Sequence, residues 1–189
     1  MITALLITST ACLSDNFQKG LDASQKGDYS TAIKEWTPLA KQGDADAQYA
    51  LGAMYFAGYG VSQNYHTAVK WYTLAAEQGN SNAQFNLGVM YGKGQGVSQN
   101  FQTAMKWYTL AASQGNALAQ FNLGLMHNRG QGVSKDQVRA HMWLNLSALT
   151  GHKKAAKLRD IVAENLTDRN LSDAQRFARE CIAKNYKGC

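Results

Sequence analysis

With 189 residues, 45% of them hydrophobic, the chain has the size and composition of one folded domain. A single proline and 17 glycines indicate helices separated by glycine turns, and three cysteines without a CxxC or Cys/His pattern argue against a zinc site. The net charge of +6 comes from the end of the chain, since residues 135–189 carry 11 basic and 6 acidic side chains. Because these charges alternate in sign, we interpret them as a solvated helix face and expect no nucleic-acid partner.

Residues 1–13 look like the second half of a secretory signal peptide. The segment Met1–Ala11 is apolar and then small, is too short to span a bilayer, and places Ser9 and Ala11 at the small positions before a cleavage site. A basic beginning is missing, so we expect the natural start to lie upstream. Two alternatives remain open. Cys12 is a lipidated cysteine that attaches the protein to a membrane, or this is an ordinary cytosolic N-terminus.

Residues 14–43 are predicted to form a first helical hairpin. Ser14 can cap its first helix, and apolar residues recur at helical spacing up to a turn at residues 27–29. The second helix contains Trp36 and also Pro38, which should kink the helix or remove one of its hydrogen bonds.

Residues 44–151 contain three copies of one 36-residue unit, which begin at Asp44, Asn80 and Asn116. Each copy predicts a helix, a glycine loop and a second helix that ends at a glycine such as Gly115. A fixed period of this size indicates a stacked array, because one hairpin cannot bury its apolar face alone. We therefore predict an all-α, right-handed α-solenoid of antiparallel helix pairs.

Small and large residues have different expected positions in this stack. We expect Gly88 to face Ala104, so that the two backbones approach closely, while Trp107 and Tyr108 fill space against the next unit.

Residues 152–189 are predicted to form a C-terminal pair of capping helices, whose polar outer face suits the end of a solenoid. The first covers Lys153–Asn165, and either Thr167 or Ser172 caps the second. The expected apolar stripe of the first helix consists of Ala156, Leu158, Ile161, Val162 and Leu166. Near the chain end, Cys181 and Cys189 can close into a small disulfide loop or remain two reduced thiols.

The repeated pattern A-x-x-x-L-G-x-M-Y-x-x-G-x-G-V-x-x-N-Y-x-x-A-x-K-W-Y-x-x-A-A-x-Q-G resembles the Sel-one-like repeat, a relative of the tetratricopeptide repeat. The resemblance covers residues 44–151, and the first hairpin resembles a tetratricopeptide unit by its Gly20, Ala32 and Trp36. The last copy departs from the pattern, with His127, Gln137 and Leu144 in place of Tyr91, Phe101 and Tyr108.

The resemblance also extends to the chain end. The sequence ARECIAKNYKGC is similar to the tails of exported bacterial members, in which such cysteines pair. It implies a Cys181–Cys189 disulfide and a periplasmic or secreted protein, with a cytoplasmic location as the alternative.

No catalytic constellation is recognisable. No serine is followed three residues later by lysine, the glycine loops lack the residues of a phosphate-binding loop, and the four histidines form no i, i+4 pair. We interpret His127 as a packing residue and expect no catalytic residue, no metal site and no cofactor. The alternative is a secreted amidohydrolase of the beta-lactamase or penicillin-binding type, as described for cysteine-rich relatives, although their cysteine pair in each repeat is missing here.

Proteins of related fold bind ligands with variable positions of the first helices, which line the concave side. Asn side chains with Lys93 and Arg129 nearby can hold an extended peptide or a carboxylate, or the amides can simply face water. We expect a monomeric, non-catalytic scaffold for a protein or peptide partner. The resemblance places its binding residues at Gln84, Asn86, Val89, Lys93, Gln120, Asn122, Leu125 and Arg129.

Overall fold

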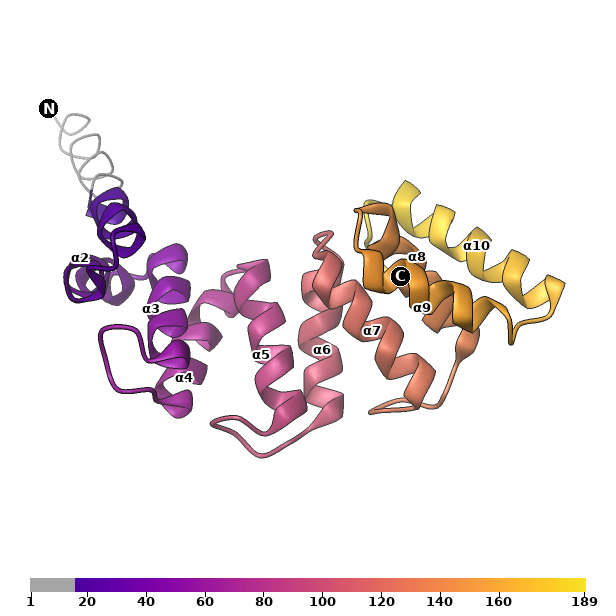
Figure 1. The fold of residues 1–189 in the computed structure, drawn as a ribbon, viewed down its shortest axis with the longest axis horizontal. Helices are drawn as coiled ribbons and strands as arrows, with labels where there is room; N and C mark the ends of the chain where they lie inside the picture. Colours follow the sequence, from indigo (N-terminus) through magenta and orange to yellow (C-terminus); the bar gives the residue numbers. More distant parts are fainter. Residues whose placement is uncertain (1–15) are drawn as a thin grey trace, which may run out of the picture. The chain divides into compact units, whose positions relative to one another are not determined.

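The computed structural model describes residues 16–189, and within this range all regular structure is helical (Figure 1). The expectations for the signal peptide, Cys12 and Ser14 lie outside the described residues. The chain divides into two compact units, one of residues up to 83 with residues 95–97, the other of residues 84–94 with residues 98–189.

The first unit consists of two helix pairs and the start of a fifth helix. A helix over residues 16–25 pairs with α2 (Tyr29–Lys41), and α3 (Ala45–Ala57) pairs with α4 (Tyr65–Glu77). The helix α5 (Ser81–Lys93) begins in this unit and continues into the other. The core of the first unit is built on Trp36, Leu39 and Leu51, all of which are fully buried.

The second unit contains most of α5 and five further helices. These are α6 (Phe101–Ala112), α7 (Ala117–Arg129), α8 (Gln137–Leu149), α9 (Lys153–Ala163) and α10 (Asp168–Ala183). In this unit α7 packs against α6 and α8, and α8 also packs against α9 and α10. The prediction of an all-α solenoid of packed helix pairs is thus confirmed, and so is a pair of helices after the last repeat.

Asp and Asn side chains start most of the helices. Each accepts a hydrogen bond from the backbone N–H three residues later, which satisfies an otherwise unpaired donor of the first helical turn. Thr167 caps α10 in the same way, which decides between the two predicted caps. The Asp and Asn caps are Asp28, Asp44, Asn64, Asn80, Asn100, Asn116 and Asp136.

Gly88 allows the two helices of a pair to approach closely, but its partner differs from the prediction. A Cβ atom on Gly88 would lie 2.5 Å from the ring of Tyr108, and that ring, not Ala104, is its nearest neighbour. The expectation placed glycine opposite another small residue, whereas the structure fits a large ring into the space that the missing side chain leaves. Tyr108 therefore packs within its own hairpin, and it also belongs to the core cluster that includes Ala119 and Leu123 of the next repeat, as expected.

The apolar side of α9 differs from the predicted stripe in two residues, because Ala155 belongs to it and Ile161 does not. Val162 and Ala155 are buried against Leu144 of α8, while Ile161 is 55% exposed. The reason is that α9 buries a narrow face, so a neighbouring residue of similar hydrophobicity points to solvent.

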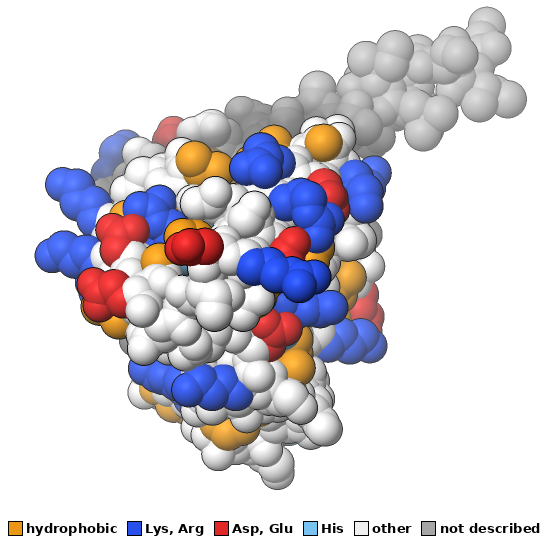
Figure 2. Space-filling model, turned by 90° about the vertical axis from the view of Figure 1, so that its right-hand side faces the viewer, with side chains coloured by type: hydrophobic (Ala, Val, Ile, Leu, Met, Phe, Trp, Pro, Cys, Tyr) orange, Lys and Arg blue, Asp and Glu red, His pale blue; other side chains and the backbone are white. Residues whose placement is uncertain are grey.

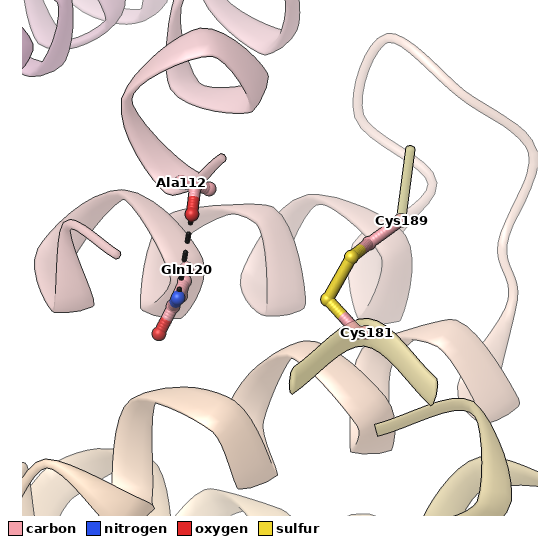
Figure 3. The surroundings of a disulfide bond; sticks show 4 residues. All are labelled: Ala112, Gln120, Cys181 and Cys189. Carbon is pink, nitrogen blue, oxygen red and sulfur yellow. Dashed lines mark hydrogen bonds between the residues drawn. A yellow bond between two sulfur atoms is a disulfide. The ribbon is translucent and has the colours of Figure 1, made fainter. Parts of the chain in front are cut away.

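A disulfide joins Cys181 of α10 to Cys189 at the chain end, with the two Cα atoms 5.4 Å apart (Figure 3). Cys181 is 3% exposed and belongs to the core of the second unit. The short segment between the cysteines brings Tyr186 against the turn at Gly115. The disulfide therefore holds the end of the chain against the repeat.

Buried glutamines connect successive helices at one end of each repeat. Gln48 donates from its Nε2 to the backbone oxygen of Ala40, at 3.0 Å, and accepts from Gln78, at 2.8 Å. In the next repeat Gln114 donates to Gln84 at 2.8 Å. Amide hydrogen bonds therefore join Gln48 to α2 and to the turn after α4, and Gln84 to the turn after α6. The bond to Ala40 is buried, and the two bonds between glutamines are partly buried.

The last repeat lacks one member of this network. Gln120 is fully buried, and its Nε2 donates to Ala112 over 3.4 Å (Figure 3). Its Oε1 atom is buried without a hydrogen-bond partner in the described part of the chain. Thr150 stands 36 residues after Gln114, at the end of α8, and its side chain does not reach Gln120 but donates to Ser147.

We predict that Thr150→Gln raises the free energy of unfolding by about 1 kcal/mol, because the new amide can donate to the unpaired Oε1 atom of Gln120. Urea denaturation measures the change. The same substitution in a Gln120→Leu background is the control and should give no gain. An equal gain in both backgrounds would show that the effect comes from the end of α8 and not from the amide pair.

Candidate functional site

Five of the eight residues expected at the binding surface line one cavity of the second unit. They are Val89 and Lys93 of α5 with Asn122, Leu125 and Arg129 of α7. We call this cavity the α5–α7 groove; its volume is about 480 Å³. Within each helix these residues share a face because they are three, four or seven positions apart. The other lining residues are Gly92, Gln99, Phe101, Ala104, Tyr108, Met126 and Gln131.

The other three expected residues lie elsewhere. Gln84 and Gln120 are buried and take part in the glutamine network, so their amides serve the stack and do not face a ligand. Asn86 is half-buried on α5 and does not line the groove, although Asn122 at the equivalent position of the next repeat does. The structure therefore does not present the two asparagines to the same space.

The charge of the groove is positive. Lys93 and Arg129 are both exposed, and the lining contains no Asp or Glu. In residues 16–189 the ion pairs engage Arg139, Arg159 and Arg176, and no acidic side chain pairs with Lys93 or Arg129. An anionic group entering the groove would thus meet two cations without displacing an internal partner.

Tyr108 forms part of the floor of the groove. It is 7% exposed, and burial raises the pKa of its hydroxyl well above the ordinary value for tyrosine. Like an ordinary tyrosine, it is protonated at physiological pH, so its hydroxyl can donate a hydrogen bond. The sequence predicted only a packing role for Tyr108, and it did not indicate that the same side chain also lines a cavity.

Gly92 keeps the groove open. A Cβ atom on Gly92 would lie 3.8 Å from that of Ala104 and 4.0 Å from the hydroxyl oxygen of Tyr108, which is ordinary contact distance. The equivalent residue of the preceding repeat is Phe56, whose ring lies 5.4 Å from that of Tyr65. The exchange of Phe for Gly along the repeat was the sequence signal that could have indicated a cavity here.

The basic end of the chain does not form a single patch. Figure 2 shows Lys and Arg side chains spread over the face on the side of α10, with acidic side chains between them. Arg176 illustrates the mixing, because it pairs with Asp173 at 3.0 Å and with Glu180 at 2.9 Å. This agrees with the interpretation of these charges as a solvated helix face.

A larger cavity lies beside the last repeat, the copy that departs most from the common pattern. It has a volume of about 670 Å³ and is lined by His127, by the loop before α8 with the first turn of that helix, and by Asn165, Leu166 and Asn170 at the connection from α9 to α10. His127 is 2% exposed, as expected for a packing residue, but its Nδ1 atom is buried without a partner among the described residues. Burial lowers the pKa of His127, an effect that Asp136 opposes and Arg139 supports.

The first unit has an apolar cavity of about 400 Å³ that the sequence did not predict. Phe17, Trp36 and Tyr49 line it. Its acidic member, Asp46, accepts a hydrogen bond from Asn80 at 3.0 Å. This cavity contains no cation, so it differs in chemistry from the α5–α7 groove.

Residues 16–189 contain neither a metal-binding cluster nor a membrane-spanning helix. No cluster of three or more His, Cys, Asp or Glu side chains is placed to hold a metal ion. No helix in this range is both long and apolar enough to cross a membrane.

Comparison with known families agrees with this architecture. The profile of the Sel1 repeat family matches residues 45–80, 81–116 and 117–152, which together make up more than half of the chain. The chain belongs to the Sel1 repeat family. Sel1 repeats form scaffolds that typically mediate protein interactions and are generally not catalytic.

Solved structures show the same fold. A Sel1 repeat protein from Oxalobacter formigenes is 30% identical and superposes with a TM-score of 0.75 over 87% of this chain and 75% of its own. A protective antigen of uropathogenic Escherichia coli with an SLR fold is 28% identical and superposes with a TM-score of 0.57. That match covers 92% of this Sel1 repeat chain and 46% of the antigen. No curated protein sequence matches the chain.

The two buried histidines predict a pH dependence of stability. Burial lowers the pKa of both His127 and His141, so the folded state favours their neutral forms. The unfolded chain then binds more protons below a pH of about 6.5, and the free energy of unfolding falls as the pH drops through that value. Urea denaturation between about pH 7 and 5.5 should show this decrease.

His127→Tyr, which introduces the residue found at the equivalent position 91, should reduce this decrease without abolishing it. Addition of His141→Met, which introduces the residue found at the equivalent position 105, should remove most of the decrease that remains. A decrease of the same size in the unchanged protein, in His127→Tyr and in the double variant would assign the pH dependence to other groups.

Proposed function

We propose that this Sel1 repeat protein is a non-catalytic scaffold that binds a protein or peptide in the α5–α7 groove. The observation that carries the proposal is the convergence of two unpaired cations, an asparagine amide and apolar side chains on one groove of about 480 Å³. A groove of this volume lies within the roughly 300–1,000 Å³ range of small-ligand pockets. It can therefore accept a few residues of a partner chain.

The lining chemistry favours recognition over catalysis. The side chains of the groove include none of the Ser, Thr, Cys, His, Asp or Glu groups that usually act as nucleophile or base in acyl transfer. The cysteines of the described chain, Cys181 and Cys189, are joined to each other and supply no free thiol. No observation favours the amidohydrolase alternative.

We also propose that the protein works in the periplasm or outside the cell. The disulfide supports this proposal, because such bonds persist in oxidising compartments and are rare in the cytosol.

Asn122 and Asn86 provide a matched pair of variants for the binding test. They have the same residue type and the same repeat position, but only Asn122 lines the groove. The probe is a set of short synthetic peptides of randomised sequence, with free or amidated C-termini, passed over the immobilised protein and quantified by mass spectrometry. Asn122→Ala should lower the retention of bound peptides by about 2- to 10-fold, the effect of one hydrogen bond, whereas Asn86→Ala should not.

Gly92→Phe is the stronger variant. The new ring should fill the groove and pack near Phe101, as Phe56 packs near Tyr65, so the fold is retained and peptide retention is lost. Circular dichroism checks the fold of each variant. Retention that Gly92→Phe leaves unchanged would place the binding site outside this groove.

Export has its own test. The intact mass of the protein isolated from its native host should correspond to a shortened N-terminus and to the loss of two hydrogen atoms in the disulfide. A mass that retains the N-terminal segment and both thiol hydrogens would contradict export.

A further inference from the structure

We infer that the α5–α7 groove binds the free C-terminal end of a protein or peptide whose last residue is apolar. The inference rests on the proposed function, because it names the part of the partner that the groove receives.

The charge of the groove selects an anionic group. Lys93 and Arg129 end α5 and α7 at equivalent positions of their repeats, and both line the groove. No carboxylate of the described chain pairs with either cation, and none lies in the lining. A carboxylate is the anion that a protein partner can offer without modification, and it forms charge-assisted hydrogen bonds with both kinds of cation.

These cations could instead serve only to stabilise the helices, since a positive charge near a helix C-terminus is favourable. The repeat itself argues against this as their main role. Position 57, which is equivalent to 93 and 129, is alanine, and α3 is nonetheless a complete helix that ends at this residue. The stack therefore does not require a cation at this position, and the two that are present are available for a ligand.

The walls of the groove select an apolar side chain next to the carboxylate. Val89 and Leu125 line it one helical turn before the two cations, and Phe101 and Met126 complete this apolar surface. The last residue of a chain carries its carboxylate and its side chain on the same Cα atom. It can therefore place charge near the cations and an apolar group near these walls at the same time. An internal Asp or Glu has its charge on the side chain and cannot do both with one residue.

Two further donors suit the rest of a terminal residue. The protonated hydroxyl of Tyr108 and the amide of Asn122 both line the groove. Asn122 can pair with a backbone amide of the ligand, since it offers both a donor and an acceptor.

The test compares two synthetic peptide pools that differ in one group. Both begin with Gly-Ser-Gly and continue with three randomised residues; one ends in a free carboxylate and the other in an amide. We expect the immobilised protein to retain the free-acid pool, enriched in peptides that end in apolar residues, and to retain the amidated pool at least about 10-fold less. Retention should also weaken with added salt.

Charge-matched variants separate the groove from general electrostatics. Lys93→Gln combined with Arg129→Gln should abolish the preference for the free-acid pool. Lys106→Gln combined with Arg169→Gln removes the same charge from exposed positions outside the groove and should leave the preference intact.

The remaining outcomes decide between the two proposals. Equal retention of both pools, lost in Gly92→Phe, would overturn the C-terminal inference and leave groove binding in place. An amidated pool enriched in internal Asp or Glu would assign the cations to side-chain carboxylates and also overturn the inference. Retention of neither pool, or retention that Gly92→Phe does not change, would overturn groove binding as well.

Discussion

The close approach of the two helices of each pair at a glycine is the contact on which the rest of the structure depends. A Cβ atom on Gly52 or Gly88 would lie 2.5 Å from the ring of a tyrosine in the paired helix, and one on Gly124 would lie 2.6 Å from Leu144. Such distances are far below van der Waals contact, so a larger residue would have to displace the partner side chain. The large partner side chain then fills the interior at the density that folded proteins require.

This contact also determines where the groove can form. Tyr108 is held against Gly88, and the same side chain reaches the floor of the groove on the side of Gly92. Packing against Gly88 therefore determines where the floor of the groove lies. The chemistry of the walls depends on other residues, which this packing does not constrain. Replacement of the phenylalanine of the first repeat by Gly92, and of alanine by Lys93, gives the second unit a space and a charge that the first repeat does not provide at these positions.

The sequence could predict the helices and their pairing because the same 36-residue pattern occurs three times, so each boundary is indicated repeatedly. It could not predict which individual side chains of a helix are buried and which are exposed. Gln84 and Gln120 were expected at a surface, since polar side chains usually are, and they are buried because a neighbouring amide or carbonyl replaces water. Likewise, the spacing of Ile161 and Val162 could not decide which of the two faces α8.

Comparison between the three copies distinguishes the buried glutamines from the exposed cations of the groove. The glutamine is the same in all three repeats, at positions 48, 84 and 120, and each copy contacts the preceding helix or its own turn. The residue at positions 57, 93 and 129 changes from alanine to lysine to arginine, and the latter two face the groove. The glutamine that every copy keeps therefore serves contacts that every copy makes between helices and turns. The position that changes from copy to copy has no such contact to keep, and the cations of the groove stand at this position.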